Sequence, residues 1–340
     1  MNGFERIMAA LEGQQPDRVP IMLHNFMMAA REAGVTMAQY RQNARTIADC
    51  FIRAQEKYGC DGILVDIDTV TLAGAVGVVV DFPENEPARF RSPLFARIEE
   101  VDDLMTVDIS TYRGVQIWLE AVSLLKAHFG DEVAIRGNCD QCPFSLAGLM
   151  RGPIEWMMDL LDETKQTRVH RLLEYCRGIT EQFIALMVER GAHMVSNGDS
   201  PAAPDMISPA MYREFAQPYE KQIARFARKL GAPYILHICG DTTAILADMA
   251  DTDASGIELD SKTDSSRARE ILTGRAAFFG NIDPVHVLAQ GSVKLVEEKT
   301  RELLRVFADS PRFVLNAGCA IPPETPPANV AAMIRTAREF

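Results

Sequence analysis

The sequence of 340 residues lacks a basic surplus and a long apolar run. Its 47 aspartate and glutamate residues outnumber its 35 lysine and arginine residues, which gives a formal net charge of −12. Nucleic-acid binding ordinarily needs a basic surface, so that class is disfavoured. No run reaches the roughly 18 apolar residues of a membrane span, and the longest one, 70–80, contains glycines. The composition therefore predicts binding to neither nucleic acid nor a membrane.

Two further features are missing. Residues 1–6 show no basic segment followed by an apolar stretch, so we expect no signal peptide and a cytoplasmic protein. In that compartment the seven cysteines are expected to be thiols or metal ligands rather than a disulfide framework. No glycine-rich phosphate loop follows an early strand, which disfavours an open doubly wound sheet.

Short apolar runs alternate with segments of helical periodicity along the whole chain. The runs expected to form strands are 18–24, 61–67, 132–138, 192–197, 233–237, 255–258, 276–280 and 312–316. The clearest helical patterns are 46–57, 115–128, 167–190, 211–230, 293–306 and 327–338. Eight strands, each followed by a helix, predict a single (β/α)8 TIM-barrel domain over 1–340 with an N-terminal extension. Segment 81–104, rich in Pro, Arg and Glu, is expected to form a hairpin or lid outside the barrel.

The most informative motif is a His-x-Cys pair, His237 and Cys239, together with the distant Cys319. One imidazole and two thiolates suit Zn²⁺, and three protein ligands leave a fourth position open, as in catalytic zinc sites. Residues two apart on a strand face the same side, so His237 and Cys239 can point into one cavity. The pattern predicts a catalytic zinc site, against the plainer alternative of a core imidazole and buried thiols.

Other polar residues follow the predicted strands, at the barrel end where active sites form. Asp66 and Asp68 are expected on one strand face, where Asp68, like Asp199, is a candidate general acid or base. Glu258 is a candidate fourth metal ligand or proton relay. For each carboxylate the alternative is a solvated loop residue. The candidate ligand-contacting residues are His24, Asn138, Gln141, Asn197 and Asn281.

Segments spread over nearly the whole chain resemble the uroporphyrinogen decarboxylase superfamily. They are 16–20, 61–68, 143–147, 208–219, 280–284 and 316–326. The resemblance implies a (β/α)8 barrel that acts as a decarboxylase or as a zinc-dependent methyltransferase working with a corrinoid protein. In the methyltransferase branch, the residues that His237, Cys239 and Cys319 resemble bind zinc.

Two departures separate this chain from the decarboxylases. They resemble one another in an arginine-rich stretch after the first strand, whereas 22–28 contains no arginine and the first to follow is Arg31. They also carry a histidine where this chain has Cys319. Asp68 resembles their catalytic aspartate, which keeps a tetrapyrrole decarboxylase as an alternative.

The resemblance therefore implies a zinc-dependent methyltransferase. It would move a methyl group between a small methylated substrate, a methoxylated compound being favoured, and the cobalt of a corrinoid. The Asp-x-His-x-x-Gly motif of cobalamin domains is missing, so we expect a separate protein to carry the corrinoid. The candidate ligand-contacting residues named above are expected to contact the substrate or the corrin. Two competing interpretations are a methyltransferase with a thiol acceptor of the coenzyme M type and a catalytically silent corrinoid- or metal-binding protein.

Overall fold

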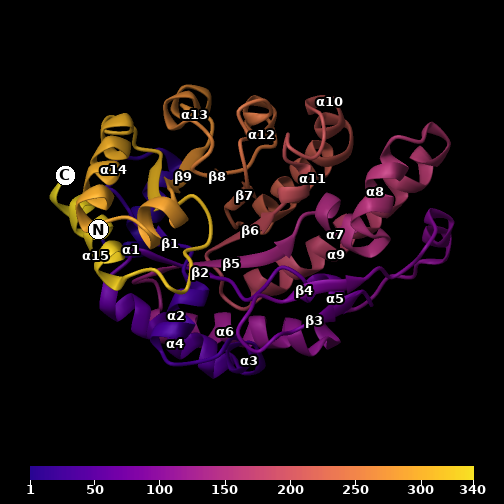
Figure 1. Cartoon of the computed structure of the whole chain (residues 1–340), viewed down its shortest axis with the longest axis horizontal. Coiled ribbons are helices and arrows are strands. Elements are labelled where there is room, and N and C mark those ends of the chain that lie inside the picture. The colour runs from indigo at the N-terminus through magenta and orange to yellow at the C-terminus, as the bar shows by residue number, and fades with distance from the viewer.

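The centre of the computed structural model, which describes residues 1–340, is a barrel of eight parallel strands (Figure 1). Their order is β1-β2-β5-β6-β7-β8-β9-β10, and a parallel bridge between Ile21 and Leu315 joins the first strand to the last. The strands are β1 Met22–Leu23, β2 Gly62–Val65, β5 Ala134–Gln141, β6 Met194–Gly198, β7 Tyr234–Ile238, β8 Gly256–Leu259, β9 Ala277–Ile282 and β10 Phe313–Ala317. The predicted TIM barrel is confirmed.

Helices surround the barrel (Figure 1). The α-helices are α1 Gly3–Glu12, α2 Phe26–Glu32, α3 Met37–Gln42, α4 Ala44–Tyr58, α5 Thr71–Ala75, α6 Arg113–Phe129, α7 Pro143–Arg151, α8 Pro153–Leu160, α9 Gln166–Glu189, α10 Pro209–Met211, α11 Gln217–Lys229, α12 Leu246–Ala250, α13 Ser265–Leu272, α14 Val293–Val306 and α15 Pro327–Glu339. The 3₁₀ turns are η1 Ile98–Asp103, η2 Ile109–Thr111, η3 Glu163–Lys165 and η4 Ser200–Ala202, and the π-helical turns are η5 Tyr212–Ala216 and η6 Pro284–Ala289. No helix combines the length and apolar character that crossing a membrane requires.

The predicted N-terminal extension is helix α1. Its apolar residues Ile7, Ala10 and Leu11 pack against a cluster of side chains contributed by strands of the barrel. These strand residues are Met22, Leu64, Ala134, Met194, Ile235, Ala277, Phe279 and Val314. Filling one part of the barrel with packed apolar side chains leaves the carboxyl ends of the strands to carry polar groups.

A two-stranded antiparallel hairpin, β3 Val79–Asp81 and β4 Arg89–Ser92, lies outside the barrel. It covers the first half of the segment 81–104 that was expected to form a hairpin or lid, and η1 lies in the second half. Arg41 of α3 fastens its turn, because its Nη2 donates to the carbonyl oxygens of Pro83, at 2.9 Å, and of Glu86, at 2.5 Å. The hairpin reaches away from the barrel toward α8 (Figure 1).

Asp61, at the start of β2, ties the N-terminal segments to the barrel. Its carboxylate accepts hydrogen bonds from Arg6 Nη1 at 2.5 Å, from both terminal nitrogens of Arg18 at 2.8 and 2.9 Å, and from the backbone N–H of Ile21 at 2.9 Å. The Asp61 side chain is only 2% exposed. A buried carboxylate with this many donors holds α1, the start of β1 and β2 in register.

We predict that Asp61→Ala lowers the free energy of unfolding by about 3–5 kcal/mol, because the buried Arg6 would lose its buried counter-ion and keep only the exposed Asp17. The matched control is Glu270→Ala, which breaks an exposed ion pair with Arg267 and should change stability by less than about 1 kcal/mol. Urea unfolding followed by circular dichroism measures both. Equal losses in the two variants would contradict the role given to Asp61.

Candidate metal centre

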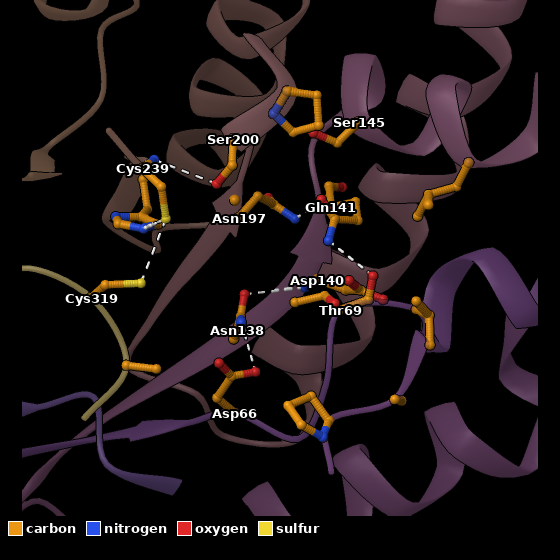
Figure 2. A pocket seen from close by; sticks show the side chains of 18 of the residues that line it. Asp66, Thr69, Asn138, Asp140, Gln141, Ser145, Asn197, Ser200, Cys239 and Cys319 are labelled. Carbon is orange, nitrogen blue, oxygen red and sulfur yellow. Dashed lines mark hydrogen bonds between the residues drawn. The ribbon is translucent and has the colours of Figure 1, made fainter. Parts of the chain in front are cut away.

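Three metal-binding side chains meet at the carboxyl end of the barrel. His237 lies in β7, Cys239 follows that strand directly, and Cys319 follows β10. Their ligand atoms all lie within 4.8 Å of one another. His237 Nε2 is 3.0 Å from Cys239 Sγ, which is 3.5 Å from Cys319 Sγ (Figure 2). The barrel thus brings together the three residues that the sequence predicted as metal ligands.

Neighbouring groups orient the cluster. His237 Nδ1 lies 3.1 Å from the backbone carbonyl oxygen of Glu258, which can only accept, so Nδ1 carries a proton and Nε2 is the ring nitrogen that faces the sulfur of Cys239. The backbone N–H of Cys239 donates to Ser200 Oγ at 3.4 Å (Figure 2). These contacts orient the imidazole ring and the backbone of Cys239, and they leave Nε2 beside the sulfur atoms.

The electrostatics of the cluster favour a thiolate. A hydrogen bond from the Cys319 thiol, with the nearby His237 ring, outweighs burial and lowers the pKa of Cys239 to about 3. The same hydrogen bond, reinforced by burial, raises the pKa of Cys319. Burial lowers the pKa of His237, but the adjacent Cys239 sulfur outweighs it and raises that pKa to about 9. The sulfur of Cys239 is therefore in the form that binds metals.

The donor set fits zinc. Sulfur and imidazole ligands suit Zn²⁺, whereas Mg²⁺ and Ca²⁺ prefer oxygen ligands, which this cluster does not contain. Cys239 and Cys319 are both partly exposed rather than enclosed in the core. With three protein ligands bordering a cavity, the geometry matches an open site better than a closed structural one.

The cluster borders a cavity of about 610 Å³. Four of the predicted ligand-contacting residues, His24, Asn138, Gln141 and Asn197, line it, as does Glu258. Figure 2 shows Cys239 and Cys319 on one side, Asp140 and Gln141 on the other, and Asn138 between them. The structure therefore gathers most of the predicted site residues around one space.

Asp66, rather than Asp68, supplies the cavity's carboxylate on the β2 side. Its Oδ2 lies 2.6 Å from His24 Nε2, and its Oδ1 accepts from Asn138 Nδ2 at 2.9 Å (Figure 2). Asp68 points elsewhere, because it accepts from the backbone N–H groups of Val70 and Thr71 at the start of α5. The strand ends at Val65, so the two-residue alternation that was expected to pair the two aspartates no longer applies there.

Glu258 is buried beside the cluster but is not part of it. Its Oε2 accepts from Arg136 Nη2 at 2.5 Å and its Oε1 from Asn316 Nδ2 at 2.6 Å. Burial raises the pKa of Glu258, but the charge of Arg136 and neighbouring histidines outweigh it and hold that pKa at about 2. Both carboxylate oxygens are engaged, and the backbone carbonyl of Glu258 is what contacts His237.

Two other predicted residues lie outside the cavity lining. Asp199 is fully buried, and its Oδ1 accepts from the backbone N–H and the hydroxyl of Ser145 at the start of α7. Asn281 Nδ2 donates to the carbonyl oxygens of Asp260 and Thr263 and so fastens the loop after β8. Both residues support neighbouring segments of the barrel mouth.

Two cavity residues were missed at the sequence level. Arg136 in β5 is 1% exposed and pairs with Glu258, and Asp140, also buried, accepts from the backbone N–H of Leu72 at 2.7 Å. The signal in the sequence was an arginine inside a predicted apolar strand. Such a residue needs a buried counter-ion, which only the folded barrel identifies.

Comparison with known proteins identifies the family. The sequence model described as uroporphyrinogen decarboxylase (URO-D) matches residues 2–340. The chain belongs to the uroporphyrinogen decarboxylase family. Within that family it resembles the methylcobamide:CoM methyltransferase MtbA of Methanosarcina acetivorans, with 28% identity over 341 residues, 99% of this chain and 97% of that protein.

Other relatives cover both branches of the family. MtaA of Methanosarcina barkeri, also named a methylcobamide:CoM methyltransferase, is 25% identical over 98% of this chain and 97% of its own length. The uroporphyrinogen decarboxylase of Chlorobaculum tepidum is 25% identical over 97% of this chain and 96% of its own length. A solved methyltransferase structure from Methanosarcina mazei has a TM-score of 0.92 at 23% identity, covering 100% of this chain and 99% of that one, which shows the fold.

A pH-dependent stability follows from the burial of Asp199. Burial outweighs the hydrogen bonds from Ser145 and raises the pKa of Asp199 from 3.8 to about 6. The folded state therefore retains a proton that the unfolded chain releases between about pH 4 and pH 6, so stability should fall as the pH rises through this window. Asp199→Asn carries no titrating proton there and should show a smaller fall.

Urea unfolding of the metal-free protein at several pH values measures this difference. The control is Asp205→Asn, at an exposed position nearby, which should keep the wild-type slope. An Asp199→Asn variant with the unchanged wild-type slope would show that Asp199 ionises normally in the folded protein.

Proposed function

We propose that this protein is a zinc-dependent methyltransferase. It moves a methyl group between a small methylated compound, a methoxylated one being favoured, and the cobalt of a corrinoid carried by a separate protein. The observation that carries the proposal is the cluster of His237, Cys239 and Cys319 bordering a cavity of about 610 Å³. The full-length similarity to proteins named methylcobamide:CoM methyltransferases supports it.

In this proposal His237 Nε2 and the sulfur atoms of Cys239 and Cys319 hold the zinc. When bound, the zinc supplies a Lewis acid that polarises an ether oxygen or favours the thiolate form of a thiol. Glu258 orients His237 through its backbone carbonyl, and Ser200 accepts from the backbone N–H of Cys239. Orienting groups of this kind keep the ligands in place when the fourth position changes occupant.

The rest of the cavity binds and orients the substrate. His24 and Asp66 form a carboxylate–imidazole pair that lines it, with His24 Nε2 2.6 Å from Asp66 Oδ2. Asn138 and Gln141 offer amide groups on the same side. Apolar side chains such as Phe26 and Leu149 exclude water from the remaining surface.

Two other functions differ from this one in testable ways. A tetrapyrrole decarboxylase would need free cations for several substrate carboxylates, but both arginines that line the cavity, Arg89 and Arg136, are paired with protein carboxylates. A methyltransferase with a thiol acceptor would use the same zinc cluster. This reaction is the second candidate, because the relatives are named methylcobamide:CoM methyltransferases. In that reaction the methyl group leaves cobalt for the sulfur.

We expect about one zinc per chain, and we expect Cys239→Ala or Cys319→Ala to weaken zinc binding by about two orders of magnitude or more, because a thiolate ligand is lost. The matched control is Cys176→Ala, at a buried thiol in α9 that is not part of the cluster. Metal analysis after dialysis against a chelator measures the difference. Zinc content that is equal in all three variants would contradict the ligand set.

The methyl-transfer reaction is tested by the absorbance of a reduced corrinoid. With Co(I) cobalamin or a corrinoid protein, a panel of methoxylated aromatics, methylamines and methyl thioethers should include a donor that removes the Co(I) absorbance. The loss should require zinc and His237. The protein should form no coproporphyrinogen from uroporphyrinogen under anaerobic conditions. Decarboxylation without any change in the cobalt spectrum would overturn the proposed function.

A further inference from the structure

The charge of the substrate can be inferred from the charged groups around the cavity. The cavity lining contains two arginines, Arg89 and Arg136, and no lysine. An anionic ligand that enters the cavity loses part of its hydration and needs a cation in exchange. The state of these two arginines therefore decides whether the cavity suits an anion.

Arg136 is already neutralised. Its Nη2 donates to Glu258 at 2.5 Å, the guanidinium lies over the ring of Phe279 at 5.6 Å, and the residue is 1% exposed. Its other two nitrogen atoms, Nε and Nη1, are buried and have no hydrogen-bond partner in the structure. A ligand in the cavity can reach Nε and Nη1 only if the atoms that cover them move, and Nη2 is already paired with Glu258.

Arg89, in strand β4 of the hairpin, is also paired with carboxylates. Its Nε donates to Asp81 and its Nη1 to Glu86, both at 3.0 Å. Its side chain is 49% exposed, so water also screens its charge. Arg91 also pairs with Asp81, at 2.6 Å, so two carboxylates balance two arginines and this side of the cavity has no net positive charge.

The remaining charged groups add no free positive charge. His24 is paired with Asp66 at 2.6 Å, and Glu258 is paired with Arg136 at 2.5 Å. Asp140 has a pKa well above its usual value, because it is buried and lies near the charge of Asp68. The cavity is therefore neutral to slightly negative outside the metal ligands.

The apolar part of the lining is wide and aromatic. It combines side chains of the helices α2, α7 and α8 with one from the lid hairpin. The residues are Phe26, Met27, Phe90, Leu149, Trp156 and Met157. Such a wall gains free energy by covering a flat ring, whereas a short charged chain would leave it in contact with water.

From this we infer that the methyl donor is an uncharged, ring-sized compound such as a methoxylated phenol, and that the cavity discriminates against anions of the same shape. The inference rests on the proposed function and deepens it. The C–O bond of the methoxyl group breaks, its electron pair stays on oxygen, and that oxygen takes a proton from water. The methyl carbon forms its new bond with the electron pair of the partner's Co(I). The same cavity should disfavour 2-mercaptoethanesulfonate, the anionic thiol called coenzyme M.

Two matched pairs of probes isolate the charge. Guaiacol and vanillate share a methoxyphenol ring and differ by one carboxylate, and 2-mercaptoethanol and 2-mercaptoethanesulfonate share a thiol and differ by a sulfonate in place of a hydroxyl. With the zinc-loaded enzyme and Co(I) corrinoid, kcat/KM should be about tenfold or more higher for guaiacol than for vanillate. Calorimetric titration should show the neutral thiol binding more tightly by a similar factor.

A cation introduced into the cavity should reverse this preference. Leu149→Lys places an unpaired ammonium group in the lining and should improve the anionic member of each pair relative to the neutral one, whereas Leu149→Met, the control, should leave both ratios unchanged. Wild-type preference for vanillate or for the sulfonate thiol would overturn the inference and leave the proposed function standing. If no donor at all is demethylated, the proposed function fails, and the thiol titration then decides the inference alone.

Discussion

The arrangement of the site depends on the buried ion pair between Arg136 and Glu258. The pair joins β5 to β8, and the second oxygen of Glu258 accepts from Asn316 on β10. The same residue offers its backbone carbonyl to His237, so the ion pair also positions the imidazole. Arg136 is the one arginine within the eight strands of the barrel. Because Glu258 neutralises its charge, Arg136 offers no free positive charge to an anionic substrate. The same ion pair therefore affects both the position of His237 and the charge of the cavity.

Closure of the barrel is the second condition for the site. Cys239 and Cys319 are 80 positions apart, yet their sulfur atoms lie 3.5 Å apart because β7 and β10 end at the same face of one closed sheet. The contact between Ile21 and Leu315 completes the ring, and Asp61 holds the first strands in place. Binding a metal across these two loops would in turn stabilise the closed barrel, because the unfolded chain cannot offer the same ligand set.

The eight strands and the ligand cluster could be predicted from the sequence because both follow simple periodicities. Strands buried on both faces are continuous apolar runs, and His237 and Cys239 are two residues apart at the end of one. Periodicity does not predict where a side chain points once the strand has ended. Asp68 lies beyond β2 and accepts from backbone N–H groups at the start of α5, and Asn281 donates to backbone carbonyls of the preceding loop. The partner of Arg136 is 122 positions away and emerges only in the folded barrel.

X-ray absorption at the zinc edge of the purified protein tests the central claim most directly, because it counts the sulfur and nitrogen atoms around the metal. The ligand set of His237, Cys239 and Cys319 predicts two sulfur atoms at about 2.3 Å and one imidazole nitrogen at about 2.0–2.1 Å, with a lighter atom completing the shell. The Cys319→Ala variant should show one sulfur. A first shell made only of oxygen and nitrogen in the wild-type protein would contradict the assignment of the metal centre.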